Sequence, residues 1–392
     1  SGRTFNNPYQ YFFEQMHMDD AIYADESIYE YPMQQGGGND GRPYSFGRPS
    51  SGGSKAAYPC KSYGQGRINP AYFYGVFDPN DMRRDVSITM TGSNGKGVEK
   101  LIPFVPNSKA EGGGLTLNKW DENRQANPWV AAQRKSGING PYMRMSEVYL
   151  GYAEVCAALG DVVTGKQYLK TVRERSFPQG LANTDAFIAS FGNDLVRAII
   201  EERGFEYAGE GDRRWTLIRS GYLPEDIKRI KDMTKAMMDG LATKGYYEFE
   251  NGNIISAYIW TKLVDAKTIY GHRLTAQCPT DKVNDPVLYP GWRGQKDNWE
   301  EMGLNYGSST PATNLAIKGL FEIVSEEEAA SLESQGYAKV NWGIDLVDYR
   351  DEYDKYLFWD YDYVSAPIYL WPFTPNVMAA GGFTNGYGFK QE

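Results

Sequence analysis

The sequence predicts a mainly α-helical fold in which tetratricopeptide-like helical hairpins carry long irregular loop insertions and a few short strands. Helical periodicity is concentrated between residues 142 and 245, whereas much of the rest is rich in the 43 Gly and 20 Pro residues. Aromatic residues are scattered through the Gly/Pro-rich stretches, which favours ordered loops over flexible linkers. A chain of 392 residues can bury a core that needs no disulfide or structural metal.

Two consecutive helical hairpins are predicted in the middle of the chain. From Tyr142 to Leu159 apolar residues recur with helical spacing, and Gly160-Asp161 ends the run. A helix over 164–175 completes the first hairpin, and helices over 184–191 and 193–207 form the second. Stacked pairs of this kind are typical of tetratricopeptide repeats, so two pairs make an incomplete stack. The inward residues expected on the first helix are Met145, Val148, Tyr149, Tyr152, Val155, Cys156 and Leu159.

Further elements are predicted on either side of the hairpins. Ser27–Met33 alternates like a short strand that ends near Pro32, and Val86–Met90 is typical of an edge strand. A helix is expected over 222–245, and Ser325 with the three glutamates that follow forms a capping box for a helix over 325–335. A last helix is expected over 348–356.

These elements divide the chain into three segments. Residues 1–141 are predicted to be loop-rich and aromatic-rich with short strands, and residues 142–245 to form the helical hairpins. Residues 246–392 are predicted to be a loop-rich segment that packs on the helices within the same structural unit.

Composition excludes several functional classes. The net charge of −9 disfavours nucleic acid, which binds basic surfaces. Three widely spaced cysteines give neither a disulfide framework nor a metal site, and only two histidines are present. No Gly-x-Ser-x-Gly motif and no EF-hand spacing occur. No run of 18 apolar residues occurs either. We therefore predict no catalytic residues, no metal and no cofactor.

Aromatic residues are unusually frequent, with 30 Tyr, 17 Phe and 9 Trp. Aromatic rings bind the C–H faces of sugars, so an acidic, tyrosine-rich chain suits a neutral ligand such as a glycan. The structural alternative is that tyrosine packs the loops while its hydroxyl satisfies polar groups.

Two long motifs resemble the SusD/RagB family of outer-membrane nutrient-binding lipoproteins. Tyr142–Glu154 reads YMRMSEVYLGYAE, and Glu201–Trp215 reads EERGFEYAGEGDRRW. The ending, with Trp371-Pro372-Phe373 and Asn385-Gly386-Tyr387, is similar to the closing segment of the family. The sequence departs from the family pattern at Thr216, where an Asp is usual, and it lacks the Pro of the closing motif.

The resemblance implies a lipid-anchored protein on the cell surface that covers a SusC-like TonB-dependent transporter of the outer membrane. Such a protein captures oligosaccharides or peptides without catalysis. The usual lipidation cysteine and first helical repeats of the family are not in this sequence, so membrane contact is expected only through an anchor outside it. Two alternatives remain open: a carboxylate-dependent glycoside hydrolase, and a scaffold whose helices contact a protein partner.

Acidic and basic residues alternate within the two motifs. We expect a buried ion-pair lattice that fixes the register between helices. The alternative is a catalytic pair, Glu202 with Glu206, but flanking arginines would keep both ionised and unsuited to proton donation. The residues expected in the lattice are Arg144, Glu147, Glu154, Glu202, Arg203, Glu206 and Arg213.

Ligand contacts are expected on aromatic loops before the Tyr142 helix, because binding there relies on ring stacking and a few hydrogen bonds. The family motifs do not extend into these loops. Trp292 and Trp299 are second-rank candidates. The first-rank candidates are Tyr44, Phe46, Tyr58, Tyr63 and Trp120, with Arg67 and Asn69 as polar partners.

Overall fold

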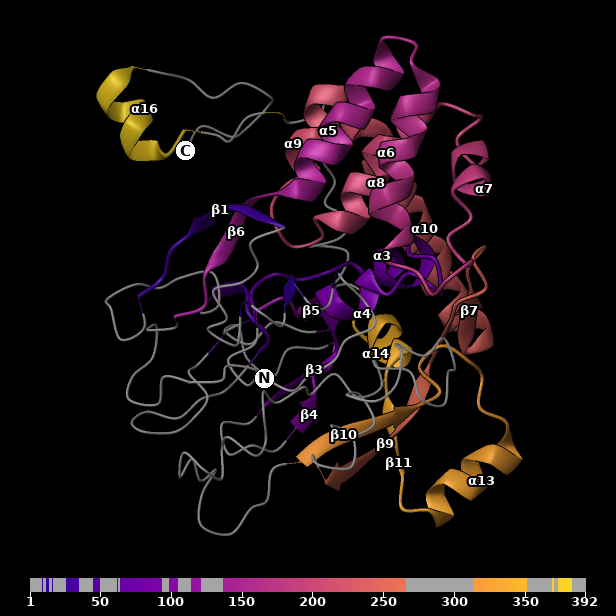
Figure 1. Cartoon of the computed structure of the whole chain (residues 1–392). Coiled ribbons are helices and arrows are strands. Elements are labelled where there is room, and N and C mark those ends of the chain that lie inside the picture. The colour runs from indigo at the N-terminus through magenta and orange to yellow at the C-terminus, as the bar shows by residue number, and fades with distance from the viewer. Residues whose placement is uncertain are drawn as a thin grey trace.

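The structure is a computed structural model. Most helices gather at one end of the molecule and most short strands at the other (Figure 1). Within the described residues no helix is long and apolar enough to cross a membrane. The described residues are 9, 12, 13, 16, 26–34, 45–49, 62, 64–93, 99–104, 114–120, 137–265, 313–350, 369 and 373–382.

The two predicted helical hairpins are confirmed. Helix α5 (Met145–Ala158) turns at Gly160 into the antiparallel helix α6 (Val162–Glu174), whose first turn is capped because Asp161 accepts a hydrogen bond from the Thr164 N–H at 3.1 Å. Helices α7 (Thr184–Ala189) and α8 (Leu195–Glu206) form the second pair. The helices share a small core, which includes Leu150, Ala153, Leu169, Val172, Ala198 and Ile199.

The predicted inward face of α5 is partly wrong. The buried side of the helix comprises Ser146, Leu150, Ala153 and Cys156, which face α6 and α8. Four of the residues expected to point inward are instead exposed: Val148, Tyr152, Val155 and Leu159. The helical spacing is correct, but α5 is apolar on two sides, and periodicity alone does not show which of them is covered.

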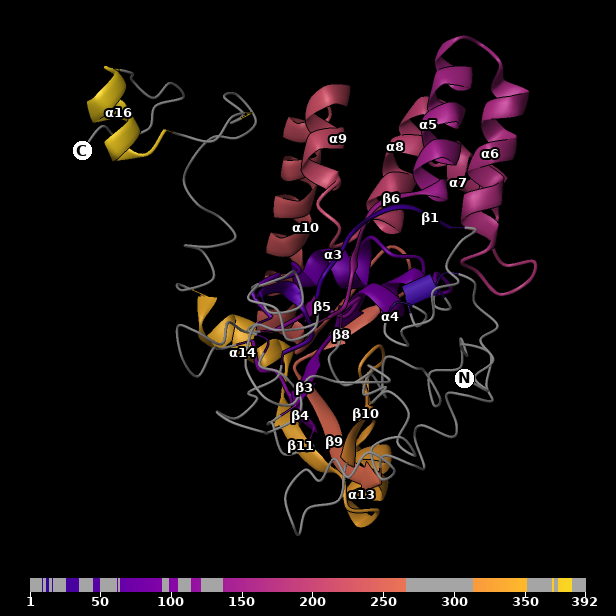
Figure 2. The same cartoon turned by 60° about the vertical axis from the view of Figure 1, so that its left-hand side comes forward.

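Two more helices follow along the chain. Helix α9 (Arg213–Ser220), which the sequence analysis did not predict, ends at Gly221 with φ of 80°, a conformation that glycine adopts without strain. Helix α10 (Leu223–Lys244) confirms the prediction over 222–245. Figure 2 shows α9 and α10 side by side, across from α5, α6 and α8.

The C-terminal helices are confirmed in part. Helix α13 (Glu326–Ser334) begins as predicted, because the Ser325 Oγ accepts a hydrogen bond from the Glu328 N–H at 3.1 Å. Helix α14 (Gly343–Asp348) was not predicted, and most of the helix expected over 348–356 lies outside the described residues. Helix α16 (Pro375–Gly381) is the last element.

The N-terminal half contributes short strands and helices. Strand β1 (Ser27–Tyr31) confirms the predicted strand and pairs with β6 (Gly140–Arg144). Helices α3 (Pro70–Gly75) and α4 (Arg83–Ser87) come between them. The strand expected from Val86 starts later, at β2 (Ile88–Thr89), because α4 continues to Ser87. Strand β2 pairs with β5 (Thr116–Leu117), and β3 (Thr91–Ser93) pairs with β4 (Glu99–Leu101).

Part of the segment from residue 246, which was expected to be loop, forms strands. Strand β7 (Tyr246–Glu248) pairs with β8 (Ile254–Ser256). Strand β9 (Tyr258–Asp265) lies between β10 (Thr313–Lys318) and β11 (Ala338–Asn341) in an antiparallel sheet. These short aromatic and β-branched runs favour strands only when neighbours cover them.

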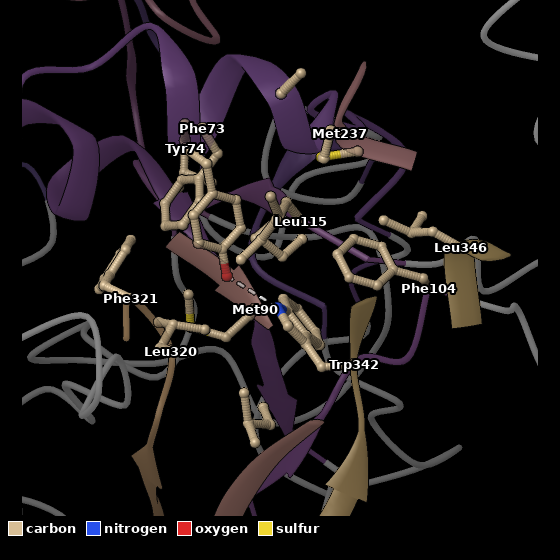
Figure 3. Close-up of a cluster of buried hydrophobic side chains, with 14 of the residues drawn as sticks. Phe73, Tyr74, Met90, Phe104, Leu115, Met237, Leu320, Phe321, Trp342 and Leu346 are labelled. Carbon is tan, nitrogen blue, oxygen red and sulfur yellow. Dashed lines mark hydrogen bonds between the residues drawn. The ribbon is translucent and has the colours of Figure 1, made fainter. Parts of the chain in front are cut away.

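The largest hydrophobic core lies where α3, α10 and α14 meet the strands. Figure 3 shows Phe73 and Tyr74 facing Phe321, and the Trp342 ring beneath Tyr74. The Trp342 Nε1 donates a hydrogen bond to the Tyr74 hydroxyl at 2.8 Å. Burial raises the pKa of Tyr74 above its ordinary value, so the hydroxyl stays neutral. This bond is the one polar contact drawn in the close-up of the cluster.

We predict that Tyr74→Phe lowers the free energy of unfolding by about 1–3 kcal/mol, because the buried Trp342 N–H loses its partner. Chemical denaturation measures this change. In the background of Trp342→Phe the same Tyr74→Phe change should cost less, since no donor is then left unpaired. Equal stability of Tyr74→Phe and the parent would contradict the assignment.

Candidate functional site

A buried network of charged side chains lies where α8 meets α5, α6 and the chain before α4. The network is electrically balanced, since it joins five basic groups to five carboxylates through direct ion pairs. We call it the charge network. It consists of Arg83, Lys119, Arg144, Arg173 and Arg175 with Glu26, Asp81, Glu202, Glu206 and Glu210.

Two glutamates of α8 form the centre of the charge network. Glu202 and Glu206 are four residues apart, so they lie on the same face of the helix, and both are fully buried. Glu202 accepts hydrogen bonds from Arg83 at 2.6 Å and Arg173 at 2.9 Å. Glu206 accepts from Arg144 at 2.8 Å and also pairs with Arg175. The predicted lattice is therefore confirmed at its centre.

Arg144 links the β1–β6 pair to the charge network. It is the last residue of β6, and its side chain is 1% exposed. It donates to Glu26 at 2.7 Å, to Glu206 at 2.8 Å and to Glu210 at 2.9 Å. One guanidinium thus fixes where the strand ends and where α5 begins.

A second charged cluster holds α8 against α9 and α10. Arg213 donates to Glu201 and to Asp226, each at 2.9 Å. Next to it, Arg203 pairs with Asp212 at 2.5 Å. The Thr216 hydroxyl, at the position where the family usually has Asp, donates to Asp212 at 2.8 Å.

The remaining lattice residues are less buried. Glu147 lies 3.4 Å from Arg203, and Glu154 pairs with Arg219 near the surface. All seven predicted residues form ion pairs, but these pairs fall into separate clusters instead of one lattice, and Glu147 and Glu154 are partly exposed. Sequence reasoning missed Arg83, Lys119, Arg173 and Arg175, because these arise from segments distant in the chain.

Burial and charge together shift the pKa values of Glu206 and Lys119 within the charge network. Burial alone would raise the pKa of Glu206, but Arg175, Arg144 and Arg83 outweigh it and hold that pKa far below its usual range. Burial lowers the pKa of Lys119 to about 8, against the opposing effect of Glu210. Glu206 is therefore ionised at neutral pH, which does not suit a general acid.

The predicted ligand residues lie in different environments. Phe46 is 45% exposed and lies beside Gly66, next to Arg67. The Asn69 Oδ1 accepts from the Ala71 N–H at 2.8 Å, and its Nδ2 donates to Thr234 at 3.0 Å, so it caps α3 and contacts α10. Trp120 is fully buried in a cluster with Phe12 and Phe13.

Five candidates lie outside the described residues: Tyr44, Tyr58, Tyr63, Trp292 and Trp299. The structure therefore places Phe46 on the surface near Gly66 and Trp120 in the interior. Ligand contact by any of the candidates remains a prediction. Sequence reasoning also missed a group of exposed tyrosines on β1 and β6, although the alternation of Tyr29 and Tyr31 was visible in the sequence.

A family model decides how the whole chain is classified. The SusD family model matches residues 6–372. The chain belongs to the SusD family. The matched range includes Arg144, Glu202 and Glu206 of the charge network.

Individual relatives are distant. A SusD-like protein from Formosa agariphila is 28% identical over 160 residues, which cover 41% of this chain and 26% of that relative. A solved SusD homologue from Bacteroides thetaiotaomicron is 18% identical, with a TM-score of 0.43, over 60% of this chain and 48% of the homologue. The surface glycan-binding protein A of the same organism, solved with laminarihexaose, is 17% identical. Its TM-score is 0.39 over 57% of this chain and 48% of that protein. The chain therefore spans at most about half the length of these relatives.

We predict that Arg203→Ala lowers stability by about 3 kcal/mol, because a buried guanidinium is lost and Asp212 keeps its charge without its partner. Thermal and chemical denaturation measure the change. Arg219→Ala is the matched control, since Arg219 also pairs with a glutamate but is about half exposed. A melting temperature of Arg203→Ala equal to that of the parent would contradict a stabilising lattice.

We also predict loss of stability in acid. The pKa values of Glu206, Glu210 and Asp226 are lowered in the folded state, so the unfolded chain binds more protons as the pH falls below about 4.5. Their contribution is complete above that pH and is lost progressively below it.

The variant Glu206→Gln isolates this effect. It should be less stable than the parent at pH 7 by about 3–5 kcal/mol, and its stability should fall less steeply below pH 4.5. Glu327→Gln, on an exposed turn of α13, should follow the parent at every pH. An acid slope of Glu206→Gln as steep as that of the parent would show that Glu206 is not responsible.

Proposed function

We propose that this chain is a non-catalytic glycan-binding protein of the cell surface that captures oligosaccharide for a SusC-like TonB-dependent outer-membrane transporter. The observation that carries the proposal is the SusD family match over residues 6–372. An acidic, tyrosine-rich composition supports a neutral ligand over a polyanion. Membrane attachment would come from a lipid anchor.

The charge network supports a structural role for the motif carboxylates. A glycoside hydrolase needs one carboxyl group with a raised pKa facing another across a substrate cleft. Glu202 and Glu206 instead lie on the same helix, fully buried and bonded to arginines. These two residues are therefore part of the frame, and a binding function fits them better than hydrolysis.

The proposed ligand contacts are those of the aromatic loops: Tyr44, Phe46, Tyr58, Tyr63 and Trp120 with Arg67 and Asn69. Rings at such positions would stack on sugars, and the two polar side chains would add hydrogen bonds. Phe46 is exposed and Arg67 is half-buried. Trp120 would act from beneath the surface, by supporting the loops that present the other rings.

A combined glycan and peptide array tests the proposal, followed by incubation of each bound glycan with the protein and chromatography of the products. Binding of a neutral glycan without released oligosaccharide is the expected result. Binding of peptides alone would replace the glycan by a peptide ligand, and released products would show an enzyme. The transporter partnership is tested separately by co-purification of the two proteins from membranes.

We predict that the variant Tyr58→Ala with Tyr63→Ala folds normally but loses about 1–3 kcal/mol of glycan-binding free energy, as removal of aromatic anchors does. Isothermal titration calorimetry measures the loss. Tyr349→Ala, which removes an exposed tyrosine that follows α14, is the control and should bind like the parent. An unchanged affinity of the double variant would remove these two residues from the site.

A further inference from the structure

The β1–β6 ribbon carries a group of exposed aromatic side chains. Tyr29 and Tyr31 of β1 are 58% and 60% exposed, and Tyr142 of β6 is 68% exposed. Ile28 and Met143 beside them are also exposed. Figure 1 shows the ribbon extending away from the foot of α5 along one side of the molecule. Three rings therefore point into solvent from an element that has two strands among the described residues.

The exposure of Tyr142 depends on an irregular strand register. Tyr29 pairs with Met143 and Glu30 pairs with Pro141, so Tyr142 is an extra residue between two pairs. In a regular strand Tyr142 and Arg144 would point to the same side. The bulge lets the Arg144 side chain enter the charge network while the Tyr142 ring points into solvent. Bulges that redirect a side chain in this way are frequent at binding and active sites.

The exposed rings have a defined mutual geometry. The centroids of Tyr29 and Tyr142 are 5.7 Å apart, and the two rings are nearly perpendicular, at 89°. This is the edge-to-face arrangement in which aromatic pairs attract each other. Each ring thus holds the other in position, and aromatic surface of the pair stays exposed to solvent.

The ribbon is held in place at both ends. At one end Arg144 is bound by three carboxylates of the charge network. At the other end Asn139 accepts a hydrogen bond from the Met33 N–H at 2.8 Å and donates to Glu30 at 2.9 Å. A surface that is already ordered loses little entropy when a ligand binds to it.

The chemistry of the ribbon favours an uncharged ligand. Arg144, the basic residue of the ribbon, is 1% exposed and fully engaged, so it is not accessible to an anion. The exposed groups are aromatic faces with hydroxyls at their rims, next to the Glu30 carboxylate. Sugars complement such a surface because they offer a C–H face and hydroxyls on the same ring. A protein partner would also cover the exposed apolar side chains. The row of three rings is narrow, however, and this shape favours an oligosaccharide over a protein.

We propose that Tyr29, Tyr31 and Tyr142 on the β1–β6 ribbon form a stacking surface for the sugar rings of an uncharged oligosaccharide. The inference rests on the proposed function and adds to it a ligand-contacting surface made of residues other than the predicted loop residues.

The experiment is calorimetric titration of the parent and single variants with neutral hexasaccharides of glucose, xylose and mannose, including laminarihexaose. For a glycan that binds the parent, Tyr142→Ala and Tyr29→Ala should each weaken affinity by about tenfold or more. Tyr142→Phe keeps the ring and should stay within about threefold of the parent. Circular dichroism and melting curves verify that the variants are folded.

Tyr152→Ala is the matched control. Tyr152 is also half exposed, and its ring contacts Tyr168 at 5.0 Å and 88°, the same arrangement as Tyr29 with Tyr142, but on helices. It should bind glycan like the parent. The inference is supported if the ribbon variants lose glycan affinity and Tyr152→Ala does not.

Three other outcomes overturn the inference. A parent that binds none of the glycans removes the proposed function and the ribbon site together. A parent that binds, with ribbon variants that bind equally well, removes the ribbon site alone and leaves the proposed function intact. Ribbon variants that keep glycan affinity but no longer co-purify with a membrane transporter would show that the ribbon is a protein contact instead.

Discussion

The structure depends on the pairing of buried arginines with the glutamates of α8. Removal of a charged group from water is costly unless its opposite charges and hydrogen bonds are all in place. The charge network meets this condition because its positive and negative charges are equal in number. Each of Glu202 and Glu206 pairs with at least two arginines. Because the arginines come from β6, α6 and the start of α4, the network also determines where these elements sit.

The charge network lies next to the exposed tyrosines of the β1–β6 ribbon. Arg144 and Tyr142 are two residues apart, and the bulge sends one inward and the other outward. The helical frame and the aromatic ribbon are therefore joined by a single strand end.

The helices were predictable because local signals agree with the packing. Ser325 caps α13 through the Glu328 N–H, and Asp161 caps α6, and both signals lie within one turn of sequence. The alternating motif charges also indicated the lattice around Glu206. What could not be predicted are partners brought in from far along the chain, such as Arg83, which lies 119 residues before Glu202.

The candidate site was less predictable for the same reason. An aromatic residue in a Gly/Pro-rich stretch can point outward or inward, and nothing local decides between the two for Trp120, which is buried among Phe12 and Phe13. Asn69 carried a helix-capping signal, with Pro70 directly after it, and this capping role is what the structure shows. Tyr142 was assigned to a helix, and the bulge that turns its ring outward depends on the register with β1, which sequence does not reveal.

The second apolar side of α5 affects how the isolated chain behaves in solution. Val148, Tyr152, Val155 and Leu159 form a water-facing stripe on a helix whose opposite side is already packed. A stripe of this kind attracts other apolar surfaces, and the repulsion expected from a net charge of −9 acts over the whole molecule and weakens as salt is added. At high protein and salt concentrations this chain will therefore self-associate more than its net charge of −9 suggests. A dilute, low-salt buffer reduces this association.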